Sequence, residues 1–173
     1  MEKNDTLLQA FEWYLPDDSQ HWNKLKVLAP SFSNLGVTVV WLPPAYKGAG
    51  GVHDVGYGVY DLYDLGEFDQ KGTIPTKYGT KQEYLDAIGA LQKENISVLA
   101  DIVLNQKMGG DTEETIDVIK SDPNNRNEEI GGDYQITAWT KFTFPNRKEK
   151  YSTFTWNASH FDGIDWDEKK KQS

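Results

Sequence analysis

One apolar run constrains the fold of this chain more than any other stretch. It extends from Ile96 to Asn105, is rich in β-branched residues, and carries a carboxylate at Asp101. Such a run is typical of a strand that is buried on both faces of a parallel sheet. A carboxylate inside it is costly unless another group pairs with it, and functional groups in parallel α/β folds gather where strands end. We therefore expect a scaffold strand whose C-terminal end contributes to a site.

Two shorter apolar runs precede this one, at residues 6–11 and 37–42, and each predicts a short buried strand. A long connection follows the second run, from residue 45 to about residue 79, and it is rich in Gly, Tyr and Asp. Connections of this length are usually functional or disordered, and the aromatic content argues against disorder. With helical segments between the strands, the order of elements predicts a parallel α/β sheet with right-handed crossovers.

Two helices are predicted between these strands. The first spans about residues 20–35, with Ser19 as its N-cap and a break or kink at Pro30. The second opens with a capping box formed by Thr80 and Glu83. The apolar positions expected to share one face of the first helix are Trp22, Leu25, Leu28, Phe32 and Leu35.

The composition and the hydrophobic pattern of the chain change after Asn105. Residues 107–173 are polar, turn-rich and aromatic, with short alternating runs such as residues 134–139. We expect a small, irregular and mostly antiparallel subdomain here.

Composition narrows the class of protein. The chain has 173 residues, a formal net charge of −9 and no cysteine. An acidic chain repels phosphate backbones, so we expect no nucleic-acid partner, whereas surplus carboxylates suit a hard cation such as calcium. The N-terminus is too polar for a signal peptide and no segment is long enough to span a membrane. We expect a cytoplasmic monomer without membrane contact, although a mature secreted form would look the same.

Several motifs resemble those of the bacterial liquefying-type α-amylases, and the similarity covers essentially the whole chain. They lie at residues 11–14, 41–48, 54–58, 61–68, 77–81, 101–105 and 161–167. The resemblance implies a (β/α)₈ TIM barrel with a β-rich subdomain inserted after the third strand. Because a barrel needs about 250 residues, we expect an incomplete one: residues 1–104 as its N-terminal part, and residues 105–173 as the truncated inserted subdomain.

The resemblance also implies an activity, the endo-hydrolysis of α-1,4-glucosidic bonds with retention. The substrates would be starch, glycogen and maltooligosaccharides. Retention needs two carboxyl groups about 5–5.5 Å apart, and in the family these lie on later strands. We therefore assign no catalytic residue and expect the 173-residue chain alone to be inactive. The alternatives are a non-catalytic glucan-binding protein and a truncated product without function.

Four residues are predicted to contribute to substrate binding. Tyr57 matches the family aromatic that stacks on the sugar next to the cleaved bond, and Asp101 matches an aspartate that supports the catalytic centre. Trp13 lines the cleft or belongs to the core. Gln106 stands where the family usually has a histidine that hydrogen-bonds the sugar, and it keeps binding capacity without the ability to become a cation.

Two residues match calcium ligands of the family, Asn105 and Asp162. Both offer oxygen atoms to a hard cation, but calcium takes about six to eight oxygens. We expect a calcium site in the full-length protein and weak or no calcium binding by this chain.

Overall fold

The computed structural model describes residues 4–171, which form two compact units. The first comprises the chain up to Gly109 together with Pro145–Ser152, and the second comprises Gly110–Phe144 and the chain from Thr153 onward. The return of Pro145–Ser152 to the first unit had no signal in the sequence. The assignment of residues 105–173 to an inserted subdomain stays a prediction.

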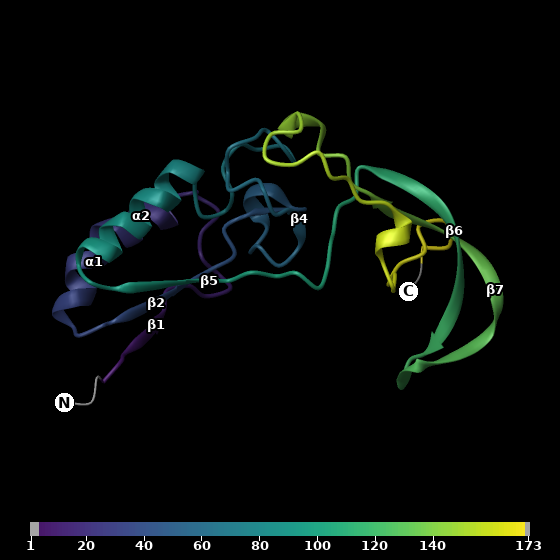
Figure 1. The fold of residues 1–173 in the computed structure, drawn as a ribbon, viewed down its shortest axis with the longest axis horizontal. Helices are drawn as coiled ribbons and strands as arrows, with labels where there is room; N and C mark the ends of the chain where they lie inside the picture. Colours follow the sequence, from purple (N-terminus) through teal and green to yellow (C-terminus); the bar gives the residue numbers. More distant parts are fainter. Residues whose placement is uncertain (1–3, 172–173) are drawn as a thin grey trace. The chain divides into compact units, whose positions relative to one another are not determined.

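The strands of the parallel sheet are separated by helices along the first unit, and a long hairpin forms most of the second (Figure 1). In chain order the elements are β1 (Leu7–Gln9), α1 (His21–Asn34), β2 (Val39–Leu42), β3 (Lys47–Gly48), the 3-10 helix η1 (Gly51–His53), β4 (Val59–Asp61), α2 (Lys81–Lys93), β5 (Ser97–Ala100), β6 (Thr112–Asp122), β7 (Asn125–Lys141) and the 3-10 helices η2 (Pro145–Arg147) and η3 (Ala158–His160). No helix among residues 4–171 has the length and apolar character needed to cross a bilayer.

The central sheet of the first unit is parallel, as predicted. Its order is β1-β2-β5, with Leu8 opposite Val40 and Val40 opposite Val98. Both helices lie on the same side of this sheet (Figure 1). Residues 4–171 therefore contain the parallel α/β layer that the order of elements predicted.

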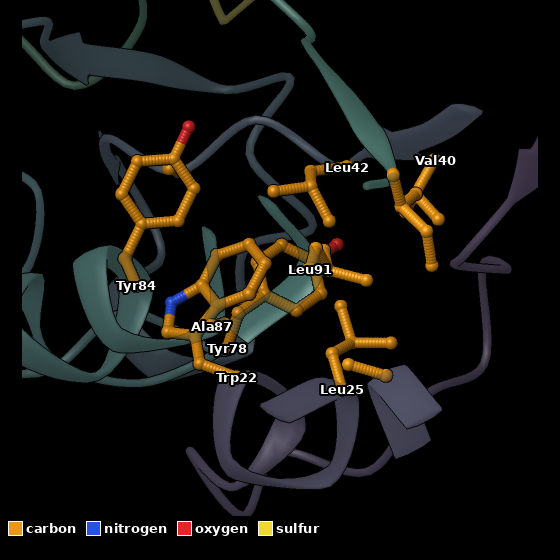
Figure 2. Packing of buried hydrophobic residues seen from close by; sticks show 11 residues of the cluster. Trp22, Leu25, Val40, Leu42, Tyr78, Tyr84, Ala87 and Leu91 are labelled. Carbon is orange, nitrogen blue, oxygen red and sulfur yellow. The ribbon is translucent and has the colours of Figure 1, made fainter. Parts of the chain in front are cut away.

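The core of the first unit lies between that sheet and the helices. Val40 and Leu42 alternate with Val39 and Trp41 along β2, so their side chains point toward the helices. Figure 2 shows Trp22 of α1 among these side chains, and its ring lies 4.9 Å from that of Tyr84 in α2. Fully burying one such side chain stabilises the fold by about 1.5–3 kcal/mol.

The details of α1 differ from the prediction. Gln20 rather than Ser19 is the N-cap residue, because Ser19 has a φ of 54° and its hydroxyl donates instead to the carbonyl of Thr76. The helix continues through Pro30. Leu28 and Leu35 are 43% and 79% exposed, and the buried position on that side is Ala29. By contrast, the capping box at Thr80 and Glu83 is confirmed.

The strands are shorter and less buried than predicted. β5 covers only Ser97–Ala100, and Leu99 and Leu104 are 49% and 75% exposed. The reason is that β5 pairs only with β2 among the described strands, and the helices cover only one face of the sheet. The prediction of a strand buried on both faces is therefore wrong for residues 4–171.

A network of buried charges holds the long connection together. Lys47 is fully buried, and its ammonium donates to the carbonyls of Thr73 and Ile74 at 2.6 and 2.7 Å and lies 3.5 Å from Asp64. Burial lowers the pKa of Lys47, and the carboxylate of Asp64 opposes that shift. The carboxylates are needed because an isolated buried cation would be too costly.

The second unit is more regular than expected. β6 and β7 form an antiparallel pair of 11 and 17 residues, with the carboxylate of Asp122 accepting backbone N–H bonds from Asn124 and Asn125 in the turn. The antiparallel prediction is confirmed. The irregular residues lie instead after β7, where Phe142 pairs with Trp156 in an isolated bridge.

Candidate functional site

A cleft of about 470 Å³ opens in the first unit, beside the C-terminal ends of β1 and β2. Its lining residues are Gln9, Phe11, Glu12, Trp13, Trp41, Val55, Tyr57 and Tyr78. Gln9 and Trp41 are in-register partners of β1 and β2. Trp41 follows the buried Val40 in β2, so it belongs to the face opposite the helices. The cleft thus occupies the place where parallel sheets usually carry their sites.

Tyr57 and Trp13 form the aromatic part of the cleft. Their rings are stacked with an interplanar angle of 4° and a centroid distance of 6.3 Å. Trp13 is 61% exposed, so it does not belong to the core, and that alternative is wrong. Flat, exposed aromatic faces bind apolar surfaces, such as the C–H faces of sugars, at low entropic cost.

Asp101 fixes the other end of the Tyr57 side chain. The Tyr57 hydroxyl donates to Asp101 Oδ2 at 2.8 Å. Burial, followed by this hydrogen bond, raises the pKa of Tyr57 to about 12, so the phenol keeps its proton at neutral pH. The two predicted residues therefore contact each other directly.

The loop that presents Tyr57 is built around Asp54. Its Oδ1 accepts backbone N–H bonds from Gly56 at 2.8 Å and Gly58 at 3.1 Å, on either side of Tyr57. A Cβ added at Gly48 would lie 2.2 Å from the Asp54 Cγ, and one at Gly58 would lie 2.4 Å from Oδ2. Gly48 and Gly58 therefore have a local reason, because a side chain at either position would collide with the Asp54 carboxylate.

Gln106 contacts the same loop from the segment after β5. Its side-chain amide donates to the backbone carbonyl of Tyr57 at 2.6 Å. Together with Asp101, it holds Tyr57 at two points, one on the ring hydroxyl and one on the backbone. Direct binding of substrate by Gln106 stays a prediction, and the structure adds this positioning contact.

The two predicted calcium ligands lie in different units. Asn105 belongs to the first and Asp162 to the second, and both are exposed. Their oxygen atoms are of the type that calcium takes, but their number is far short of its coordination. Among residues 4–171, no group of three or more His, Asp or Glu side chains is arranged to hold a metal ion. These residues alone therefore do not fit a calcium site.

Sequence reasoning missed part of the cleft. Trp41 could have been found from the alternation along β2, which places it opposite Val40 and Leu42. Tyr78 had no such signal, because it comes from the long connection, where no periodicity applies. Tyr78 is 1% exposed, and its hydroxyl donates to the carbonyl of Val55, another lining residue, at 2.9 Å.

Comparison with known proteins identifies the family. The model of the α-amylase catalytic domain matches residues 25–173. The chain belongs to the α-amylase catalytic-domain family. An α-amylase of Geobacillus stearothermophilus is 56% identical over 170 residues, which cover 98% of this chain and 31% of the relative. A glucan 1,4-α-maltohexaosidase of Bacillus sp. (strain 707) is 51% identical over 168 residues, which cover 97% of this chain and 32% of the relative.

Solved structures agree with this assignment. Alternansucrase in complex with isomaltotriose superposes with a TM-score of 0.74 and 26% identity, over 85% of this chain and 14% of that one. The 173-residue chain spans about a third of the length of the curated relatives it matches.

Proposed function

We propose that these 173 residues supply the aromatic half of a glucan-binding cleft in an endo-acting α-amylase that hydrolyses α-1,4-glucans with retention. The observation that carries the proposal is the stacked pair of Trp13 and Tyr57, held in place by Asp101 and Gln106. The names of the relatives, an α-amylase and a maltohexaosidase, support the substrate class. The first three strands would belong to a (β/α)₈ barrel.

The acidic side chains at this cleft are engaged in positioning other groups. Glu12 Oε2 accepts the backbone N–H of Tyr14 at 2.6 Å, and Asp101 Oδ2 accepts the Tyr57 hydroxyl. A retaining glycosidase needs one carboxylate free to attack and one carboxylic acid free to donate. In this proposal those two groups come from the two thirds of the relatives that this chain does not match. Asp101 and Gln106 orient the stacking ring, and Tyr57 presents its face to the sugar.

The remaining expectations belong to the same proposal. The protein would act as a cytoplasmic monomer, with no nucleic-acid or membrane partner. Calcium, if bound by the full-length protein, would need Asn105 and Asp162 together with further oxygen ligands, and it would supply structural rigidity.

Binding to insoluble starch and release of reducing ends test the proposal on two proteins. These are the 173-residue chain and the full-length product of its gene. We expect the 173-residue chain to bind starch without releasing reducing ends, and the full-length product to do both. Tyr57→Ala should abolish binding to starch. Tyr134 is an exposed tyrosine of β7, and Tyr134→Ala should leave binding to starch unchanged.

The outcomes separate the alternatives. A full-length product that binds starch but releases no reducing ends would favour the non-catalytic glucan-binding protein. Hydrolysis by the 173-residue chain would show that it contains a catalytic carboxylate pair. It would contradict the proposal that this chain supplies only binding residues. Aggregation of the chain on expression, with no starch binding, would favour a truncated product without function.

A further inference from the structure

Tyr46 stands between two buried neighbours in the long connection. It is 3% exposed, and Ala45 and Lys47 on either side of it are 6% and 0% exposed. A side chain flanked in this way has little freedom, because protein interiors are close-packed. Burial, opposed by one backbone hydrogen bond and supported by the carboxylates of Asp101 and Asp54, raises the pKa of Tyr46 to about 12. The ring is therefore held in one place and keeps a neutral hydroxyl group at neutral pH.

The hydroxyl group of Tyr46 holds the segment that follows β5. Its oxygen accepts the backbone N–H of Val103 at 2.7 Å. Residues 101–106 lie outside any helix or strand, and Ile102 and Leu104 are 57% and 75% exposed. Apolar contacts therefore contribute little to the position of this segment, and single hydrogen bonds have a large influence on it.

Val103 lies between the two residues that hold Tyr57. Asp101 precedes it by two positions, and Gln106 follows it by three. The Tyr57 hydroxyl donates to Asp101 at 2.8 Å, and the side-chain amide of Gln106 donates to the Tyr57 carbonyl at 2.6 Å. Hydrogen bonds weaken steeply when their geometry departs from the optimum. Both contacts therefore depend on where the backbone lies at Val103.

Tyr46 acts on Asp101 and Gln106 together. Asp101 lies between the end of β5 and Val103. Gln106 lies between Val103 and residues 107–108, which donate to backbone carbonyls of β4. Release of Val103 would therefore loosen both side chains at once, whereas release of the segment from β4 would act first on Gln106.

We propose that Tyr46 is a positioning residue of the glucan-binding cleft. Its hydroxyl group fixes the backbone at Val103, and this sets the places of the two side chains that hold Tyr57. The lining of the cleft is formed by other residues, so Tyr46 acts without touching the sugar. It raises the affinity because a ring that is already oriented loses less freedom when the sugar binds. This inference rests on the proposed glucan-binding function.

Removal of the hydroxyl group alone tests this role. Isothermal titration calorimetry measures the affinity of maltoheptaose for the unsubstituted chain, for Tyr46→Phe and for Tyr84→Phe. Phenylalanine keeps the ring and removes only the oxygen that accepts from Val103. Tyr46→Phe should weaken binding about three- to tenfold, as expected for the loss of one orienting hydrogen bond. Tyr84→Phe is the matched control, because it removes a tyrosine hydroxyl from a buried position of α2 and should leave the affinity unchanged.

A double-mutant cycle separates positioning from a general loss of stability. The background Tyr57→Phe/Gln106→Ala lacks both contacts through which Tyr46 acts, and it keeps an aromatic ring to stack on the sugar. In this background, Tyr46→Phe should change the affinity by less than about twofold. A loss equal to that in the unsubstituted chain would overturn the positioning role, and so would an unchanged affinity in Tyr46→Phe itself.

A spectroscopic measurement follows the same role without sugar. In proton–nitrogen correlation NMR spectra, the side-chain amide signal of Gln106 reports its hydrogen bond to the Tyr57 carbonyl. Tyr46→Phe should shift this signal toward that of free glutamine, whereas Tyr84→Phe should leave it in place, with far-ultraviolet circular dichroism confirming that each variant is folded. An unshifted signal in Tyr46→Phe would overturn the positioning role. Failure of the unsubstituted chain to bind maltoheptaose would instead overturn the glucan-binding function, and the NMR shift would still decide whether Tyr46 positions Gln106.

Discussion

Replacing Arg147 with methionine should strongly destabilise the first unit. Arg147 is 3% exposed, and its Nε donates to Asp61 Oδ2 at 2.9 Å. Its Nη1 donates to the carbonyls of Lys150 at 2.7 Å and Ser152 at 2.5 Å. These contacts tie Pro145–Ser152 to β4, which ends at Asp61. Methionine fills a similar volume but donates no hydrogen bond, so the carboxylate would stay buried without its cation.

The size of the expected loss in unfolding free energy follows from the burial of both side chains of the pair. The side chains of Arg147 and Asp61 are 2% and 1% exposed, and removing one partner of such a pair costs about 3–5 kcal/mol. Asp61 keeps bonds from the Tyr63 N–H at 3.1 Å and the Gln70 amide at 3.0 Å, so we expect the lower end, about 3 kcal/mol. With an m-value of about 1–3 kcal/mol/M, the urea midpoint should fall by about 1–3 M.

Urea titration followed by tryptophan fluorescence measures this shift. Lys24→Met is the matched control, because it removes an exposed ion pair with Asp18 and should leave the midpoint unchanged within error. The double variant Arg147→Met/Asp61→Leu should recover much of the loss, since it leaves no unpaired buried charge. A midpoint for Arg147→Met equal to that of the unsubstituted chain would refute the reasoning, because it would mean that Asp61 does not depend on the guanidinium.

Three further predictions test the helices and one surface ion-pair cluster. Thr80→Ala removes the capping box of α2 and should cost about 1 kcal/mol in the same urea titration, whereas Thr80→Ser should restore it. Leu91→Ala leaves a cavity at a fully buried position and should lower the free energy of unfolding by about 2–5 kcal/mol, and a loss below about 0.5 kcal/mol would count against the packing described. Hydrogen bonds from Lys150 and Lys81 lower the pKa of Glu67 to about 2 from 4.5, so its contribution is present above pH 4.5 and is lost as the pH falls toward 2. The stability difference between the unsubstituted chain and Glu67→Gln should therefore shrink between pH 5 and pH 2, and a difference that is constant over this range would contradict the assignment.

Local chemistry explains which parts of the fold could be predicted. Gly36 and Asn95 both have positive φ values, 81° and 61°, as expected for residues that end helices. Thr80 and Glu83 form the predicted capping box because a cap involves only neighbouring residues. Two local predictions were wrong. Ser19 donates to the distant carbonyl of Thr76 instead of capping α1, and α1 does not break at Pro30.

In the candidate site, too, the sequence predicted single residues but not the contacts between them. The motif around Tyr57 was visible in the sequence, and so was Asp101 at the end of the apolar run. Their hydrogen bond joins residues 44 positions apart, and the bond from Gln106 to Tyr57 joins residues 49 apart. Periodicity predicts neither contact, because both depend on how the long connection folds back over the ends of the strands.

By itself, the sequence determined the order of strands and helices in the first unit, its parallel sheet and the capping box at Thr80 and Glu83. The capping box depends on neighbouring residues, and the parallel direction follows from the helices that connect the strands. Only the tertiary structure decided that Trp13 lies on the surface beside Tyr57, that one face of β5 stays uncovered among residues 4–171, and that Arg147 pairs with Asp61 across 86 positions. A buried charge needs a partner, but the sequence does not say which one; the path of the chain brings that partner within reach.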